Sequence, residues 1–206
     1  CICLAVNTSI REFFSITCYH TFLKLFGCFM FDSLYTLLSE KSAIPFVEYM
    51  QHALYAPDGG YYSSRRIKFG KEGDFITAPE LSPLFGQTLA RQCQQILETL
   101  SRPTDTLEFG AGSGRLCIDV LRELERQDCL PDHYYILEVS GGLRDLQQAN
   151  IRQEIPQLAE RVVWIERWPE EFVGVILANE VLDAMPVHRF LKTEEGLCES
   201  WVCLDS

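Results

Sequence analysis

The chain has 206 residues, of which 47% are hydrophobic, and it carries 29 acidic and 18 basic side chains for a net charge of −11. A chain of this length can bury one substantial core and has little room for a second. The acidic balance disfavours binding to nucleic acid, because phosphate backbones attract basic surfaces, so we expect no nucleic-acid partner.

The first 29 residues differ in composition from the rest of the chain. They hold four of the nine cysteines but only three charged side chains, Arg11, Glu12 and Lys24. His20 and Lys24 interrupt the apolar run, so we expect no stable membrane span. We interpret residues 1–29 as a leader or a non-native upstream segment, and a mitochondrial or membrane-targeting role is the alternative. The other five cysteines lack metal-type spacing, which predicts reduced thiols and no metal site.

Residues 30–102 are expected to form an N-terminal helical region that includes a lid. Apolar residues recur at helical spacing from 33 to 55, which predicts two helices, with Pro45 as the first residue of the second. A longer helix is predicted from 81 to 100, with Ser82 as its cap. Its apolar face is expected to comprise Leu84, Phe85, Leu89, Ile96, Leu97 and Leu100.

The loop at residues 73–80 precedes this long helix and mixes small, polar and aromatic residues. We interpret it as a candidate lid over a cofactor, with Thr77 and Pro79 as candidate cofactor contacts. An ordinary connecting loop is the alternative.

After Pro103 the pattern changes to alternating strands and helices. Strands are predicted at 106–109, 134–139, 162–165 and 173–178, and helices at 115–127 and 143–150. Apolar strands that alternate with amphipathic helices predict parallel strands covered on both faces, as in a doubly wound α/β sheet. Residues 103–206 are expected to form the first part of this sheet domain, followed by a hairpin of 189–191 with 201–204.

The run from Glu108 to Arg115 follows the first predicted strand and contains Gly110, Gly112 and Gly114. Glycines permit positive φ and let a ligand approach the main chain beside the N–H groups of the next helix. Arg115 stands where a dinucleotide fingerprint has a third Gly or Ala. Glu108 precedes the turn, where a carboxylate would repel a pyrophosphate. The turn therefore favours S-adenosylmethionine, which has an ammonium, a sulfonium and a ribose diol but no phosphate.

Other polar residues follow the predicted strands at the carboxyl edge of the sheet, where such sheets bind ligands. Glu138 is expected to accept both ribose hydroxyls, and a solvated strand-end acid is the alternative. Asn179, Glu180 and Asp183 follow the fourth strand and are candidate catalytic residues; acids that complement a helix dipole are the alternative. Trp168 can contact an adenine, although tryptophans more often belong to the core.

Five motifs occur in order along the chain. They are ALYxPxxGYY at 53–62, GDFxTAPE at 73–80, the glycine turn at 108–115, LExSxxLR at 137–144 and LANExxDAxPVH at 177–188. With these motifs the chain resembles the MidA-like family of S-adenosylmethionine-dependent methyltransferases, which includes a mitochondrial complex I assembly factor that methylates arginine. The resemblance covers residues 34–202. The chain departs from the family pattern in two ways. Gly141 and Gly142 follow Ser140, where the family usually has proline after the serine. Family members also continue well beyond the position of residue 206.

The resemblance implies a Rossmann-like class I methyltransferase sheet of seven strands, of which this chain is expected to hold the first four and a hairpin. It also implies methylation of a protein arginine, with a respiratory complex I subunit as partner, in the mitochondrial matrix of a eukaryote or the cytoplasm of a bacterium. From their chemistry, Glu180 and Asp183 are expected to hold the guanidinium. Two alternatives are an assembly module that binds cofactor or subunit without methyl transfer, and a nicotinamide-dependent oxidoreductase, which Glu108 and Arg115 disfavour.

Overall fold

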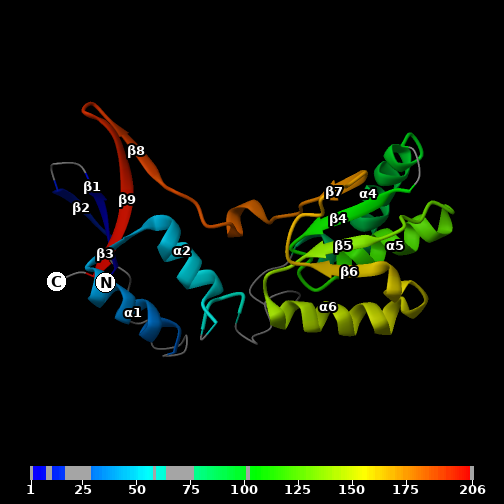
Figure 1. Ribbon diagram of the computed structural model, residues 1–206, viewed down its shortest axis with the longest axis horizontal. Coiled ribbons are helices and arrows are strands. Elements are labelled where there is room, and N and C mark those ends of the chain that lie inside the picture. The colour runs from blue at the N-terminus through cyan, green and yellow to red at the C-terminus, as the bar shows by residue number, and fades with distance from the viewer. Residues whose placement is uncertain are drawn as a thin grey trace. The chain divides into compact units, whose positions relative to one another are not determined.

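A computed structural model describes residues 2–7, 11–16, 29–57, 59–63, 77–100 and 103–204, with the backbone alone for 2–7, 11–16 and 29–32. The chain divides into two compact units (Figure 1). The first unit comprises residues 1–64 and 184–206, and the second comprises residues 65–183. From the sequence, the sheet domain was expected to begin at residue 103, whereas the second unit begins at residue 65. The reason is that the long helix before residue 103 packs with the parallel sheet.

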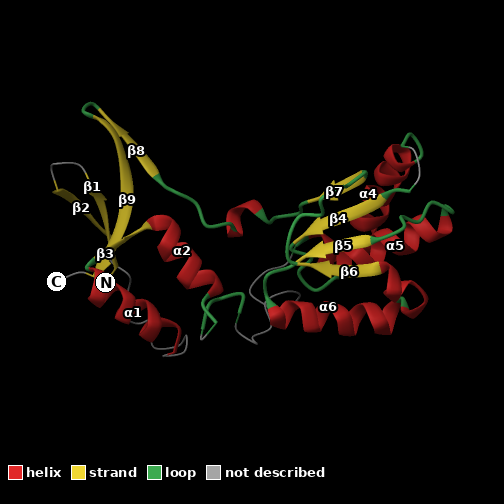
Figure 2. Cartoon of the chain, viewed as in Figure 1, coloured by secondary structure: helices red, strands yellow, loops and turns green. Residues whose placement is uncertain are grey.

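The second unit is built on a four-stranded parallel sheet. Its strands are β4 (Asp105–Phe109), β5 (Tyr134–Leu137), β6 (Val162–Ile165) and β7 (Gly174–Leu177). They lie side by side in the order β6-β5-β4-β7 (Figure 2). The four predicted strands are thus confirmed, and β4 lies between its successor β5 and the last strand β7.

Helices of the second unit precede or connect these strands. They are α3 (Ala78–Leu81), α4 (Pro83–Leu97), α5 (Arg115–Arg126) and α6 (Gly141–Glu154), with a 3-10 helix at Pro156–Arg161. Both predicted connecting helices are confirmed, and α6 is longer at each end than the sequence suggested. No described helix is long and apolar enough to cross a membrane.

Helices α4, α5 and α6 pack against one face of the parallel sheet. Side chains alternate along a strand, and one alternate set joins α4, α5 and α6 in a single core. That set comprises Tyr134, Ile136, Val162, Val175 and Leu177. On the other face Leu107 of β4 is fully buried, whereas its neighbour Ile176 on β7 is 47% exposed. The sequence predicted that both faces of the sheet are covered. The chain passes from β4 to β5 and from β5 to β6 in the same direction across the sheet. Two right-handed connections in the same direction place their helices, α5 and α6, on the same face.

Helix α4 begins as predicted but buries a different face. The Ser82 hydroxyl accepts a hydrogen bond from the backbone N–H of Leu84 at 3.2 Å, as a helix cap does. The buried residues are Gly86, Ala90, Cys93 and Leu97. Leu84 is 68% exposed and Ile96 is also exposed, so these two assignments were wrong. The reason is steric: a Cβ at position 86 would lie 2.6 Å from Cβ of Asp119 on α5, so the small residues of α4 form its contact surface.

The first unit contains an antiparallel sheet and two helices. Its elements are β1 (Ile2–Asn7), β2 (Arg11–Ile16), α1 (Phe29–Lys41), β3 (Ala43–Pro45), α2 (Phe46–Tyr55), β8 (Phe190–Thr193) and β9 (Gly196–Leu204). The sheet order is β2-β1-β9-β3, and β8 also pairs with β9. The two predicted helices are confirmed, but Pro45 precedes α2 as its cap residue. Within the segment interpreted as a leader, the backbones of β1 and β2 pair with each other, and β1 also pairs with β9.

The predicted hairpin exists with a different register. Strand β8 pairs with residues 196–199 of β9, because only residues 194 and 195 separate the two strands and a two-residue turn fixes the register. Residues 201–203 of β9 instead pair with β3, and residues 199–204 pair with β1. A small core of Leu34, Leu38, Ile44 and Val202 joins the helices to this sheet.

The five cysteines whose side chains are described are buried. They are Cys93, Cys117, Cys129, Cys198 and Cys203. Burial raises the pKa of the Cys93 thiol to about 11, so this side chain behaves as a small apolar residue of the core.

The close approach of α4 to α5 gives a stability prediction. Gly86→Ala should lower the free energy of unfolding by about 1–3 kcal/mol, because the added methyl overpacks the contact with Asp119. Gly142→Ala is the matched control: a Cβ there meets nothing within 4 Å, and the change should raise the free energy of unfolding by up to about 1 kcal/mol. Urea denaturation measures both, and equal stability of the two variants would contradict the packing argument.

Candidate functional site

The turn from Gly110 to Gly114 joins β4 to α5 through three residues with left-handed backbone. The φ angles are 58° at Gly110, 56° at Gly112 and 84° at Gly114, a region that non-glycine residues rarely adopt. A Cβ at Gly110 would also lie 3.1 Å from Cγ2 of Val181, in the loop after β7. The turn therefore requires glycine for its backbone, and at Gly110 also for its proximity to that loop.

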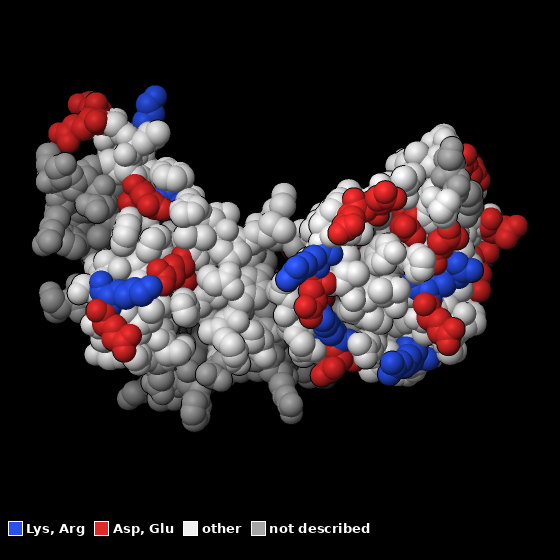
Figure 3. Space-filling model, viewed as in Figure 1, with Lys and Arg blue, Asp and Glu red and all other residues white. Residues whose placement is uncertain are grey.

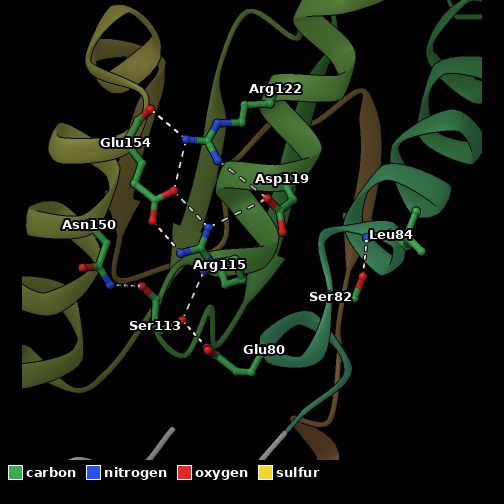
Figure 4. Close-up of polar contacts among 9 residues, drawn as sticks. All are labelled: Glu80, Ser82, Leu84, Ser113, Arg115, Asp119, Arg122, Asn150 and Glu154. Carbon is green, nitrogen blue, oxygen red and sulfur yellow. Dashed lines mark hydrogen bonds and ion pairs between the residues drawn. The ribbon is translucent and has the colours of Figure 1, made fainter. Parts of the chain in front are cut away.

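Ser113 connects this turn to the segment that precedes α4. Its hydroxyl donates to Glu80 and accepts from the backbone N–H of Arg115 at 3.3 Å (Figure 4). Because Gly114 has no side chain, Ser113 supplies the polar contact at the start of α5. Pro79 is buried beside Glu80 in α3, and Thr77 precedes that helix. The 77–80 part of the expected lid thus adjoins the turn, while residues 73–76 lie outside the described chain.

Glu138 follows β5 and is only 5% exposed, so it is not the solvated acid of the alternative interpretation. Its Oε1 accepts from the backbone N–H of Ser140 at 2.9 Å, and its Oε2 accepts from Nε2 of Gln147 at 3.1 Å. Burial raises the pKa of Glu138, whereas these hydrogen bonds and the charge of Arg144 lower it. The donors partly restore the charged form that burial disfavours.

Glu108 lies beneath the turn on the helix-covered face of the sheet. Its Oε2 accepts from the Tyr134 hydroxyl at 2.7 Å. Burial raises the pKa of Glu108 to about 7, an effect that the Tyr134 hydrogen bond opposes and the nearby Glu138 reinforces. This carboxylate is part of the core, and its contact with a cofactor stays a prediction.

Trp168 lies after β6 and is 50% exposed, so it is not a buried core tryptophan. Its ring stacks on Phe109, with centroids 5.9 Å apart, and also contacts Phe172. Phe109 is the last residue of β4 and directly precedes Gly110. The exposed indole therefore adjoins the glycine turn, on the sheet face that α5 does not cover.

The candidate catalytic residues lie in the loop that follows β7. Asn179 is partly buried, whereas Glu180 and Asp183 are exposed. Glu180 has a φ of 50°, an uncommon conformation for a non-glycine residue and one that concentrates at functional sites. Val181 contacts the position of Gly110, so this loop and the glycine turn are adjacent.

Arg115, which stands where a dinucleotide-binding fingerprint has its third glycine, forms ion pairs with acidic side chains. Its Nη2 lies 2.5 Å from Oε1 of Glu154 on α6, and Arg122 binds the same carboxylate at 3.1 Å. Asp119 lies near both guanidinium groups (Figure 4). Basic side chains elsewhere on this unit also lie beside acidic ones (Figure 3). Arg115 thus links α5 to α6.

Two residues that contact the glycine turn were not predicted from the sequence: Gln147 and Asn150. The sequence does mark Gln147 as unusual, because it lies four residues from both Leu143 and Ile151 and so shares the buried face of α6 with them. A polar residue at a buried helical position needs a hydrogen-bond partner. Among the described side chains, no group of three His, Cys, Asp or Glu residues could hold a metal ion.

Comparisons with known proteins agree with this geometry. The family model described as "Putative S-adenosyl-L-methionine-dependent methyltransferase" matches residues 88–206. Among solved structures, a COG1565 superfamily member from Burkholderia thailandensis bound to S-adenosyl-homocysteine is 44% identical with a TM-score of 0.77, over 86% of this chain and 47% of that one.

Curated relatives match at lower identity. The mitochondrial protein arginine methyltransferase NDUFAF7 of Bos taurus is 31% identical over 82% of this chain and 43% of its own length. Its homologue in Drosophila melanogaster is 33% identical over 71% of this chain and 38% of its own length. The chain therefore spans less than half the length of these relatives.

The environment of Glu138 predicts its effect on binding of S-adenosyl-homocysteine. Glu138→Ala should weaken that binding by about 1.5–3 kcal/mol, the range for hydrogen bonds that involve a charged group. Calorimetric titration measures the loss, with the exposed Glu170→Ala as control. Unchanged affinity in a folded Glu138→Ala protein would remove Glu138 from the binding site.

The buried Glu108 predicts a pH dependence of stability. Its pKa is raised from 4.5 to about 7 on folding, so the stability that the protonated form contributes is fully present below pH 4.5 and is lost as the pH rises through 7. Relative to Glu108→Gln, the unsubstituted chain should lose about 3 kcal/mol of unfolding free energy across this window. Urea denaturation between pH 4.5 and 8.5 measures the difference. The same pH profile in both proteins would show that Glu108 titrates normally.

Proposed function

The chain belongs to this family of S-adenosyl-L-methionine-dependent methyltransferases, and we propose that the protein transfers a methyl group from S-adenosylmethionine to a nitrogen of a protein arginine. The observation that carries the proposal is the left-handed glycine turn beside the buried Glu138. When bound, S-adenosylmethionine supplies an electrophilic methyl group on its sulfonium.

The residues around the turn fit such a cofactor by their chemistry. Glu138 is a buried acceptor held by donors on both oxygens, and a carboxylate at this strand end suits ribose hydroxyls. Gly110, Gly112 and Gly114 leave the main chain open to the amino-acid part. The exposed ring of Trp168 is the proposed contact for the adenine, and Thr77 and Pro79 are proposed contacts from α3 and its start. Arg115 is held by Glu154, so it does not offer a free cation to a phosphate.

The loop after β7 provides the proposed acceptor site. A guanidinium stays protonated at ordinary pH, so an enzyme must orient one of its nitrogens. Glu180 and Asp183 are two exposed carboxylates in this loop, and we propose that they bind the guanidinium through charge-assisted hydrogen bonds. Asn179 adds an amide that can orient the same group. Bound in this way, one nitrogen of the arginine would be positioned to form a bond to the methyl carbon in line with the methyl–sulfur bond that breaks. S-adenosyl-homocysteine would then leave, and the proton on that nitrogen would pass to one of the two carboxylates or to water.

The names of the curated relatives support arginine as the acceptor. A respiratory complex I subunit is the proposed protein partner, because the five motifs resemble the family that contains a complex I assembly factor. The mitochondrial matrix is the proposed compartment in a eukaryotic source, and the cytoplasm in a bacterial one. Binding of cofactor without any methylated product would instead support an assembly module.

The proposed roles of the carboxylates predict separate effects on turnover and on cofactor binding. Glu180→Gln should lower turnover about 10- to 100-fold, the equivalent of one charge-assisted hydrogen bond to the acceptor, and leave S-adenosyl-homocysteine affinity unchanged. The measurement is mass spectrometry of complex I subunits after incubation with isotope-labelled S-adenosylmethionine, with the exposed Glu170→Gln as control. Parallel losses of turnover and cofactor affinity would place Glu180 in the cofactor pocket.

A further inference from the structure

Helix α6 directs two side-chain amides at the glycine turn. Nε2 of Gln147 donates to the carbonyl of Gly112 at 3.0 Å, and Nδ2 of Asn150 donates to the carbonyl of Ser113 at 2.9 Å. The two carbonyls are consecutive in the turn, and residues three apart share a helix face. The turn is therefore held from α6 by two neutral donors.

Gln147 also reaches the second group of the proposed cofactor site. Its Nε2 lies 3.1 Å from Oε2 of Glu138, and its side chain is fully buried. A primary amide has two N–H groups, which here serve one acceptor each. A single buried amide thus connects the turn after β4 with the acid after β5.

Trp164 on β6 determines which way this amide faces. The indole Nε1 donates to Oε1 of Gln147 at 2.8 Å. An indole N–H can only donate, so the oxygen of Gln147 faces Trp164 and its nitrogen faces Gly112 and Glu138. The reversed amide would place donor against donor at Trp164 and acceptor against acceptor at Glu138, which is costly for buried groups.

We propose that Gln147 is a positioning residue of the cofactor site, which holds the Gly112–Ser113 peptide and the Glu138 carboxylate in a fixed relation before the cofactor binds. In a trans peptide the C=O and N–H groups point in opposite directions. Holding the Gly112 carbonyl toward α6 therefore turns the N–H of Ser113 away from α6. The identity of the ligand in this inference rests on the proposed function. The positioning role rests on the hydrogen bonds that Gln147 of α6 forms with Gly112 and Glu138.

Gln147 also affects the protonation of Glu138. Burial raises the pKa of Glu138, and hydrogen bonds from backbone N–H groups and from Gln147, together with the charge of Arg144, lower it. The carboxylate of Glu108 on β4 also interacts electrostatically with Glu138. Removal of the Gln147 donor raises the pKa of Glu138 further, so more of the protein carries a neutral Glu138 as the pH falls.

The test compares Gln147→Met with Gln148→Met, the neighbouring glutamine on the same helix. Calorimetric titration with S-adenosyl-homocysteine at several pH values from 6 to 8.5 should show about tenfold weaker binding for Gln147→Met at pH 8. The deficit should grow as the pH falls, while Gln148→Met follows the unsubstituted chain. Trp164→Phe should act in the same direction with a smaller loss, since it removes only the group that orients the amide.

Hydrogen exchange of the chain without cofactor supplies a second readout. In Gln147→Met the amides of Gly110 and Gly114, which donate to Leu137 and Ala111, should exchange faster, with the rest of β4 and β5 unchanged. Affinity equal to that of Gln148→Met at every pH, unchanged exchange at the turn, or a uniform loss of protection across the unit would each overturn the positioning role. If the unsubstituted chain does not bind S-adenosyl-homocysteine, the proposed function is contradicted. Faster hydrogen exchange at the turn in Gln147→Met would still support the positioning role in that case.

Discussion

The left-handed backbone of Gly110, Gly112 and Gly114 is the constraint on which the second unit depends. It turns the chain from the end of β4 into α5 within five residues, so that α5 packs back on the sheet that β4 has just left. The other parts of the site are placed by contact with this turn: Val181 at Gly110, Gln147 at Gly112 and Glu80 at Ser113. Residues with a Cβ would resist this backbone at three positions together.

Two carboxylates near the carboxyl ends of neighbouring strands differ in their surroundings. Glu108 is deeply buried with the Tyr134 hydroxyl as its donor, and its pKa rises to about 7 because burial dominates. Burial also raises the pKa of Glu138, but backbone N–H groups, the Gln147 amide and the charge of Arg144 oppose this shift. Two carboxylates of the same type can thus differ in pKa and in role because their surroundings differ. Glu138 thus has donors that favour its charged form, which agrees with its proposed role as an acceptor for a ligand, whereas Glu108 has the Tyr134 hydroxyl and lies in the core.

Local patterns were sufficient to predict the strands of the parallel sheet, the helices between them and the glycine turn, because each rests on short-range periodicity or glycine spacing. The packing face of α4 was not predictable from hydrophobicity, since Gly86 and Ala90 bring the helix close to α5 and leave Leu84 exposed. The pairing of β9 with β3 depends on residues far apart in sequence. The role of Gln147 depends on three contacts from different elements, and the sequence indicates only that a polar residue occupies a buried helical position.

The order of the strands explains why the proposed site residues surround the turn. The chain moves from β4 to β5 and β6 in one direction and then crosses to β7 on the far side of β4. Loops after β5 and β7 consequently flank the turn after β4, which brings Glu138 to one side and Asn179 and Glu180 to the other. The crossing segment carries Trp168 onto Phe109, on the face opposite to α5. A ligand at the turn would therefore meet Glu138, Trp168 and the loop after β7 through the strand order itself.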